Sequence, residues 1–105
     1  MQLSRNISGQ NFIVTGAARG IGLAISTLFS NLGAKVSGWD IDADEMRDNS
    51  VFSDTQVVDV TDEKATIAGF ASSLQRLGDI DGIIANAGIN GPTKPMWEYS
   101  LAEWH

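Results

Sequence analysis

The stretch that decides the fold is Thr15-Gly16-Ala17-Ala18-Arg19-Gly20-Ile21-Gly22, which separates an apolar run at residues 11–15 from a segment with helical periodicity. A turn that binds phosphate needs glycines because the chain must reverse tightly, approach the anion without a Cβ, and pack its helix closely on the strand. Free N–H groups at the helix N-terminus then face the anion, and Arg19 adds a positive charge. The stretch therefore predicts a dinucleotide pyrophosphate site, with a purely structural glycine turn as the alternative. It is not a nucleoside-triphosphate P-loop, because no Gly-Lys-Ser/Thr follows.

The patterns on either side of this turn are those of a buried strand and an amphipathic helix. Asn11-Phe12-Ile13-Val14-Thr15 is a short apolar run, typical of a fully buried strand. Gly33 stands where a left-handed residue commonly ends a helix. The expected buried face of that helix consists of apolar residues at helical spacing: Ile21, Ala24, Ile25, Leu28, Phe29 and Leu32.

The rest of the chain continues this alternation of strands and helices. Further strands are expected at residues 34–39, 56–58 and 81–86. The polar segment 42–49 has room for two helical turns at most, and Thr61 is the expected N-cap of a second long helix that Gly78 closes. The expected buried face of the second helix is Ile67, Phe70, Ala71, Leu74 and Leu77.

Strands that alternate with helices through short loops favour a parallel sheet covered on both faces. Right-handed crossovers make 3-2-1-4 the expected strand order. We therefore expect an α/β fold, a Rossmann-type doubly wound parallel sheet that stops after its fourth strand.

The last fifteen residues follow a different pattern. Gly91-Pro92-Thr93-Lys94-Pro95 predicts a loop, and Ser100 with Glu103 fits a capping box, which starts a helix. Because His105 ends the chain two residues later, we expect this helix to begin near Ser100 and to be cut. Residues 1–105 are accordingly expected to be the N-terminal, dinucleotide-binding part of one Rossmann domain, incomplete in itself.

An acidic residue stands where such a fold binds ribose. Asp40 ends the second strand 18 residues after Gly22, and its carboxylate is placed to accept hydrogen bonds from the adenosine 2′-OH and to repel a 2′-phosphate. Arg19 has the opposite effect, since a basic residue in the loop attracts a 2′-phosphate. We favour NAD over NADP because Asp40 lies on the ribose itself. The alternative is an ordinary strand-end acid that opens a turn.

Composition excludes several classes of protein. No cysteine is present and the one histidine is His105, so thiolate sites, His-pair metal sites and a nucleophile–His dyad in a core are excluded. The net charge of −6 has the wrong sign for a nucleic-acid partner. With no N-terminal apolar segment and no 18-residue apolar run, we expect a cytoplasmic protein without a membrane partner or a metal.

These motifs resemble the short-chain dehydrogenase/reductase superfamily. Its Thr-Gly-x-x-x-Gly-x-Gly fingerprint matches residues 15–22, its Asp-Val pair matches Asp59-Val60, and its Asn-Ala-Gly matches Asn86-Ala87-Gly88. The resemblance implies that Asp59 contacts the adenine amino group, that Asn86 steadies the centre of the sheet, and that the Ala87 backbone lies near the ribose. Taken alone, Asp59 also fits a residue before a helix cap, and Asn86 the start of a turn.

The resemblance implies one set of cofactor-binding residues and an oxidoreductase activity on alcohols and ketones. The set is Thr15, Gly16, Ala18, Arg19, Gly20, Ile21, Gly22, Asp40, Ile41, Asp59, Val60, Asn86, Ala87 and Gly88.

The family's catalytic residues have no counterpart in the chain. Members use a Ser and a Tyr-x-x-x-Lys pair, in which tyrosine supplies the proton and lysine lowers its pKa. Here the one tyrosine, Tyr99, is followed four residues later by Glu103, which would raise the phenol pKa. We therefore predict no catalytic residue and a chain inactive alone.

Two functions remain open at this point. The first is the cofactor-binding half of an NAD(P)-dependent short-chain dehydrogenase; the second is a non-catalytic dinucleotide-binding module, or half of a split enzyme completed by a partner chain. A methyltransferase is disfavoured by the wide glycine spacing. The exposed edge at residues 82–85 predicts a homo-oligomer or another partner there, because it leaves backbone groups unpaired.

Overall fold

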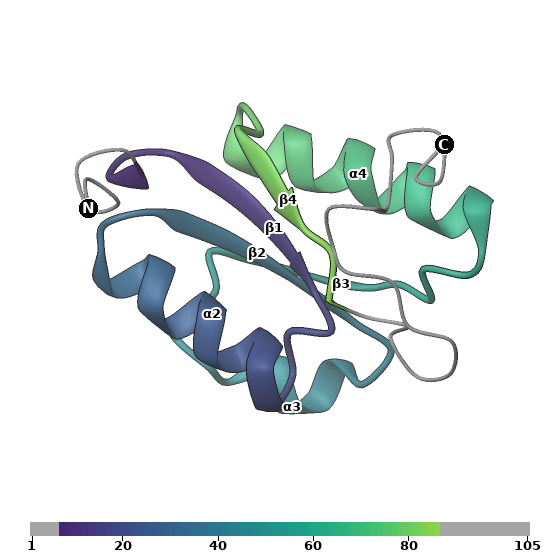
Figure 1. Cartoon of the computed structure of the whole chain (residues 1–105). Coiled ribbons are helices and arrows are strands. Elements are labelled where there is room, and N and C mark those ends of the chain that lie inside the picture. Colours follow the sequence, from purple (N-terminus) through teal and green to yellow (C-terminus); the bar gives the residue numbers. More distant parts are fainter. Residues whose placement is uncertain (1–6, 87–105) are drawn as a thin grey trace.

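The computed structural model describes residues 7–86, which form a four-stranded parallel sheet with helices on both faces (Figure 1). The elements are β1 (Asn11–Thr15), α2 (Gly20–Asn31), β2 (Lys35–Asp40), α3 (Ala43–Arg47), β3 (Asp54–Val57), α4 (Glu63–Leu77) and β4 (Gly82–Ile84). The strand order is β3-β2-β1-β4, which confirms the expected Rossmann-type order 3-2-1-4. The helix expected near Ser100 lies outside the described residues.

The register brings the carboxyl ends of the strands to one edge of the sheet. Thr15 pairs with Trp39 and Val14 pairs with Ile84, so β1, β2 and β4 end side by side. β3 continues the row, because Val57 pairs with Asp40. In a parallel sheet of this kind the loops beyond the carboxyl ends form the ligand-binding edge.

The sheet is buried on both faces at its centre. Ile13, Val14, Val36 and Trp39 are no more than 1% exposed, and successive residues of β1 point to opposite faces. α2 and α3 cover one face and α4 covers the other (Figure 1).

α4 packs on the sheet through small residues and not through its apolar ones. Thr66, Gly69 and Ser73 are buried, and a Cβ on Gly69 would lie 2.8 Å from Val58 Cγ2 and 3.3 Å from Trp39. The expected buried face was wrong, because most of its residues turn outward: Ile67 is 55% exposed, Phe70 37%, Leu74 39%, and Ala71 is also exposed. Only Leu77 of that set is half-buried.

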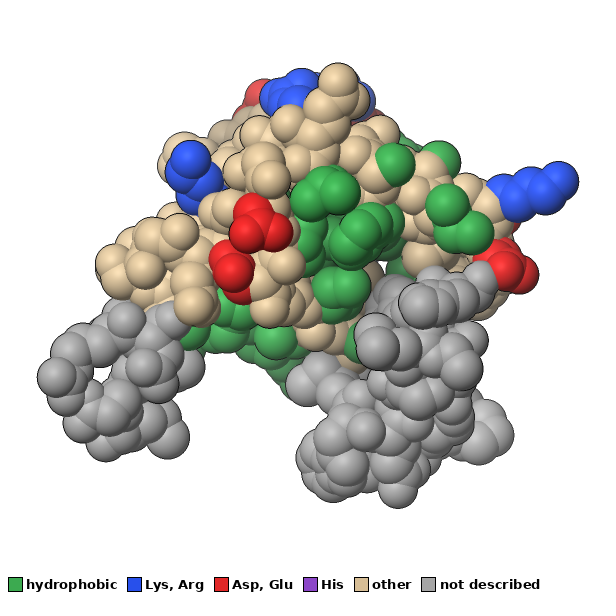
Figure 2. Space-filling view, turned by 90° about the horizontal axis from the view of Figure 1, so that it is seen from above, with side chains coloured by type: hydrophobic (Ala, Val, Ile, Leu, Met, Phe, Trp, Pro, Cys, Tyr) green, Lys and Arg blue, Asp and Glu red, His purple; other side chains and the backbone are tan. Residues whose placement is uncertain are grey.

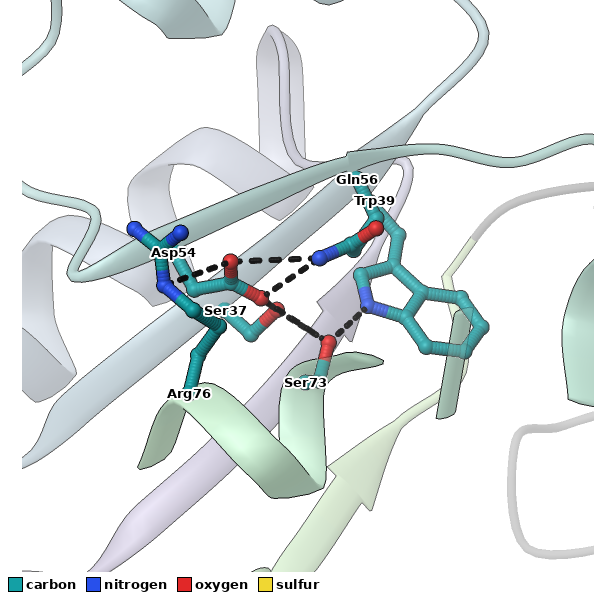
Figure 3. A network of polar contacts seen from close by, with 6 residues as sticks. All are labelled: Ser37, Trp39, Asp54, Gln56, Ser73 and Arg76. Atoms are coloured by element: carbon teal, nitrogen blue, oxygen red, sulfur yellow. Dashed lines mark hydrogen bonds and ion pairs between the residues drawn. The ribbon is translucent and has the colours of Figure 1, made fainter. Parts of the chain in front are cut away.

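A buried polar network explains why the small face of α4 is turned inward. Its members are Ser37, Trp39, Asp54, Gln56, Ser73 and Arg76 (Figure 3). The carboxylate of Asp54, 3% exposed, lies 2.8 Å from Ser37 Oγ, 3.0 Å from Ser73 Oγ and 3.1 Å from Gln56 Nε2, while Arg76 Nε lies 3.9 Å away. Trp39 Nε1 donates to Ser73 Oγ at 3.0 Å. Because a buried carboxylate needs such donors, Ser73 must face the sheet.

α2 also differs from the amphipathic pattern. Gly22 and Ser26 are its buried residues, Ile25, Phe29 and Leu32 are half-buried, and Ile21, Ala24 and Leu28 are exposed. The helix therefore approaches the sheet through Gly22, where the absence of a side chain permits the closest contact. Gly33, with φ of 94°, ends the helix in the left-handed region, as expected.

Several element boundaries differ from those expected, including β2 (Lys35–Asp40, not 34–39) and β4 (Gly82–Ile84, not 81–86). β3 covers Asp54–Val57 and not residues 56–58, because it pairs with β2 from Ser37 onward. The N-cap of α4 is Asp62, whose side chain accepts a hydrogen bond from Ala65 N at 3.1 Å. Thr61 does not cap the helix, since its hydroxyl donates to Asp59 Oδ1 at 2.6 Å.

The network predicts a large stability loss on removal of its carboxylate. Asp54→Ala removes the buried carboxylate that accepts from both Ser37 and Ser73, which then have only each other, and is expected to cost about 3 kcal/mol of unfolding free energy, measured by urea denaturation followed by circular dichroism. Asp48→Ala, at an exposed carboxylate, is the control and should cost less than about 0.5 kcal/mol. Equal losses in the two variants would contradict a stabilising role for the network.

Candidate functional site

The glycine-rich loop joins β1 to α2 and is held to the end of β2 by two backbone hydrogen bonds. Ala17 N donates to Trp39 O at 3.1 Å, and Ala18 N donates to Asp40 Oδ2 at 3.0 Å. Gly16 and Gly20 have φ angles of 64° and 63°, in the left-handed region that glycine adopts without strain. The loop is thus fixed in shape before any ligand binds.

Gly22 makes the closest contact in the site. A Cβ at this position would lie 2.0 Å from Gly16 O, 2.7 Å from Gly16 C and 2.9 Å from Asn86 Nδ2. No side chain fits there, so the first turn of α2 rests directly on the loop. At Gly20, in contrast, a Cβ would meet nothing within 4 Å, which leaves the outer side of the loop open.

The N-terminus of α2 is left without a protein cap. Its N-cap residue, Arg19, makes no side-chain capping bond, and no acidic residue lies in the first turn. The N-terminus of α4 differs, because Asp62 caps it and Glu63 lies in its first turn. The first N–H groups of a helix need partners and carry partial positive charge. The end of α2 is therefore suited to an external anion.

Asp40 lies beside the loop at the end of β2. Its Oδ2 accepts the Ala18 N–H and its Oδ1 accepts the N–H of Asp42 at 3.1 Å. These two bonds fix the carboxylate while leaving it half-buried, within reach of solvent. Ile41, the next residue, is 70% exposed and presents apolar surface at the same strand end.

Arg19 is held by two acidic residues that sequence reasoning did not single out. Its Nη2 pairs with Asp42 Oδ2 and lies 3.0 Å from Glu45 Oε1. Asp42 is the N-cap of α3 and Glu45 lies in its first turn. The acid-rich segment after Asp40 was the available signal, but only the fold brings it to Arg19.

Asn86 and Thr15 connect the loop to the end of β4. Asn86 N donates to Thr15 Oγ1 at 2.9 Å, Asn86 Nδ2 donates to Gly16 O at 3.3 Å, and Thr15 Oγ1 lies 3.5 Å from Ile84 O. Asn86 therefore supports the carbonyl on which Gly22 rests. Ala87 and Gly88, predicted with it, lie outside the described residues.

Asp59 follows β3 at the same edge of the sheet. Its Oδ1 accepts the hydroxyl of Thr61 at 2.6 Å and the Thr61 N–H at 2.9 Å, and these bonds, the hydroxyl first, lower the pKa of the carboxyl. Asp59 thus stays ionised and turns the chain into α4, as a residue that precedes a helix cap would. Val60, the other half of the pair, packs half-buried against the cluster of Ile13, Trp39 and Val58.

The predicted residues within the described chain gather at one edge of the sheet. The loop, Ile21 at 69% exposure, Asp40 with Ile41, and Asn86 surround the open N-terminus of α2, while Asp59 and Val60 lie beyond β2 at the end of β3. Within residues 7–86, no cluster of three His, Cys, Asp or Glu side chains is placed to hold a metal ion. No helix in this range has the length and apolar character needed to cross a membrane.

Comparison with known proteins gives a consistent result. The family model for short chain dehydrogenase matches residues 10–105. A 2-dehydro-3-deoxy-L-rhamnonate dehydrogenase (NAD(+)) from Sphingomonas sp. (strain SKA58) is 37% identical over 97 residues, covering 90% of this chain and 39% of that protein. Gluconate 5-dehydrogenase from Gluconobacter oxydans (strain 621H) is 35% identical over 106 residues, covering 94% and 41%. The chain thus spans about two fifths of the length of these curated relatives.

Solved structures agree with the fold. Hydroxysteroid dehydrogenase from Escherichia coli superimposes with a TM-score of 0.75 at 30% identity, over 97% of this chain and 46% of that one. Levodione reductase superimposes with a TM-score of 0.73 at 28% identity, over 92% and 41%.

Alanine substitutions at three glycines distinguish the cost of a steric clash from the cost of a strained backbone angle. Gly22→Ala places a Cβ against backbone atoms that cannot give way, so we expect a loss of folded protein or a cost above about 3 kcal/mol. Gly20→Ala and Gly78→Ala have open space but positive φ, and each should cost about 1–2 kcal/mol. Thermal and urea unfolding of the three variants measures these losses of unfolding free energy. A Gly22→Ala variant no less stable than the other two would contradict the close contact at Gly22.

Proposed function

Because this chain belongs to the short-chain dehydrogenase family, we propose that its described edge binds the adenosine diphosphate part of NAD in an enzyme that interconverts alcohols and ketones. The observation that carries the proposal is the bond from Ala18 N to Asp40 Oδ2. It places a fixed carboxylate next to an uncapped helix N-terminus, which is the pair of groups that a ribose and a pyrophosphate require.

The residues at this edge fit an adenosine diphosphate group. The space beyond Gly20 is open, so backbone N–H groups of the loop can be approached closely, and the first turn of α2 offers donors and a favourable dipole to a pyrophosphate. Asp40 would accept hydrogen bonds from the ribose, and exposed Ile41 offers apolar surface to a base. Asp59, ionised and exposed, would accept a hydrogen bond from the adenine amino group.

Among the nicotinamide cofactors we propose NAD. The Asp40 carboxylate accepts hydrogen bonds from a free 2′-OH and repels a 2′-phosphate. The rhamnonate dehydrogenase relative is named for NAD(+), which supports the same choice.

When bound, the nicotinamide of the cofactor accepts or donates the hydride. The described residues hold the other half of the molecule, so their proposed role is to bind and orient. The chain contains no Tyr-x-x-x-Lys, and we propose that the 105 residues alone do not turn over substrate. Ala87 and Gly88 are also proposed as cofactor-binding residues, because they continue the Asn-Ala-Gly motif that begins at Asn86.

Nucleotide titration tests the proposed role. By isothermal calorimetry, NAD, ADP-ribose and 5′-ADP should bind the chain with dissociation constants within about threefold of one another, because the nicotinamide adds little contact. Asp40→Ala should weaken ADP-ribose by about tenfold through the lost ribose bonds. Asp48→Ala, the exposed control, should change nothing.

Two outcomes would count against the proposal. Absence of binding by all three nucleotides contradicts the site itself. A large gain from the nicotinamide ring contradicts the assignment of these residues to the adenosine half alone.

Partners form a second proposal, carried by the outward face of α4 and the edge strand β4. Ile67, Phe70 and Leu74 follow one helical face at spacings of three and four, and Figure 2, seen from the α4 side, shows hydrophobic side chains gathered on this surface. β4 is the last strand of the described sheet and has one neighbour, β1. We propose that two copies of this chain associate, because α4 exposes large apolar side chains and β4 is the outermost strand of the described sheet.

Sedimentation velocity tests this association. The chain should form dimers at high micromolar concentration, and Ile67→Lys should shift it to monomer by placing a charge in the contact. Leu28→Lys is the matched control, because Leu28 is 48% exposed but lies on α2. A wild-type monomer, or equal dissociation by both variants, would overturn the proposal.

A further inference from the structure

The ion pairs of Arg19 join the glycine-rich loop to α3 across the ribose side of the site. Nη2 of Arg19 contacts Asp42 Oδ2 and lies 3.0 Å from Glu45 Oε1. The N–H of Asp42 also donates to Asp40 Oδ1. Residues 40–45, at and just after the end of β2, carry four carboxylates, and Arg19 pairs with two of them, Asp42 and Glu45.

This arrangement directs the positive charge of Arg19 away from a ligand. Arg19 is the one basic residue of the loop, and a phosphate on the ribose 2′ position would need it as a partner. To provide that contact, the guanidinium would have to leave two carboxylates with which it is already paired. The phosphate would at the same time meet their negative charge.

We infer that Asp42 and Glu45 are specificity-determining residues, which hold Arg19 in ion pairs and so exclude a dinucleotide with a 2′-phosphate. The inference rests on the proposed function and extends it, because it assigns part of the cofactor choice to residues that do not themselves face the ribose hydroxyls. It implies that the substitution of Asp40 alone leaves part of the exclusion of a 2′-phosphate in place.

The exposure of the three side chains makes the inference testable without loss of the fold. Arg19, Asp42 and Glu45 are 66%, 41% and 47% exposed, and exposed ion pairs of this kind contribute little to stability. Asp42 makes no side-chain capping bond to α3, so its replacement by asparagine removes charge and no cap. Their effect on a charged ligand is therefore separable from folding.

A mutant cycle with two nucleotides measures the effect. The proteins are the wild type, Asp40→Ser, the double variant Asp42→Asn/Glu45→Gln, and the triple variant; the probes are 5′-ADP and 2′,5′-ADP at constant ionic strength. Asp40→Ser alone should improve the affinity for 2′,5′-ADP relative to 5′-ADP by no more than about threefold, and the triple variant by at least about thirtyfold. Equal ratios in Asp40→Ser and the triple variant would overturn the inference.

Asp44→Asn is the matched control. Asp44 lies on the same helix but pairs with Arg47, 3.2 Å away, and not with Arg19. Its replacement removes one carboxylate from α3 and should leave the ratio of the two nucleotides unchanged. A shift equal to that of the Asp42/Glu45 pair would show general charge reduction instead of the release of Arg19.

A measurement without nucleotide separates this inference from the proposed function. The guanidinium N–H signals of Arg19 in a 15N spectrum should show restricted rotation in the wild type and free rotation in Asp42→Asn/Glu45→Gln. Free rotation in the wild type overturns the inference even if 5′-ADP binds. If 5′-ADP does not bind, the proposed function is wrong and the specificity assigned to these residues is wrong with it.

Discussion

The contact of Gly22 with the carbonyl of Gly16 sets the position of everything else at the site. Since a Cβ would lie 2.0 Å from that oxygen, α2 lies as near to the end of β1 as backbone atoms permit. Asn86 holds the same carbonyl through its Nδ2, so β4 is joined to the contact as well. The loop between Gly16 and Gly22 is short, and its Ala17 and Ala18 N–H groups donate to Trp39 O and Asp40 Oδ2. One close backbone approach thus places the strand ends, the helix dipole and the acidic residue in a single arrangement.

The features that sequence reasoning predicted are those that depend on local chain geometry. The glycines, the strand before them and the acid after the second strand lie within about one βαβ unit, and right-handed connection of such units leaves little choice of strand order. Asp40 was found because its distance from Gly22 along the chain is set by one helix and one strand. Gly33 and Gly78 were found for the same reason, since each ends a helix in the left-handed region.

The features that were missed depend on contacts between distant segments. The hydrophobic pattern of α4 indicated an inward face of Ile67, Phe70 and Leu74, but Asp54 is buried under the helix and needs the hydroxyl of Ser73, which lies on a different face of the helix. A carboxylate in the core costs far more when it is unpaired than an isoleucine costs when it is exposed. The polar requirement therefore decides the orientation of the helix. Likewise, the ion pairs of Arg19 with Asp42 and Glu45 join residues from two elements, and neither element shows the pairing by its own pattern.

The orientation of α4 has a consequence for its surroundings. A helix whose small polar face is turned toward the sheet presents its large apolar residues on the outside, and α4 does so while packing on β3 and β2. Exposed apolar side chains of this kind are costly in water, so the orientation that satisfies Asp54 leaves apolar surface on the outer side of α4. At the glycine-rich loop, Arg19 with its acids, Thr15 and Asn86 are paired within the described residues, and the uncapped N-terminus of α2 is the group left for an external anion. Within residues 7–86 the loop side chains are therefore paired internally, whereas large apolar side chains of α4 lie exposed.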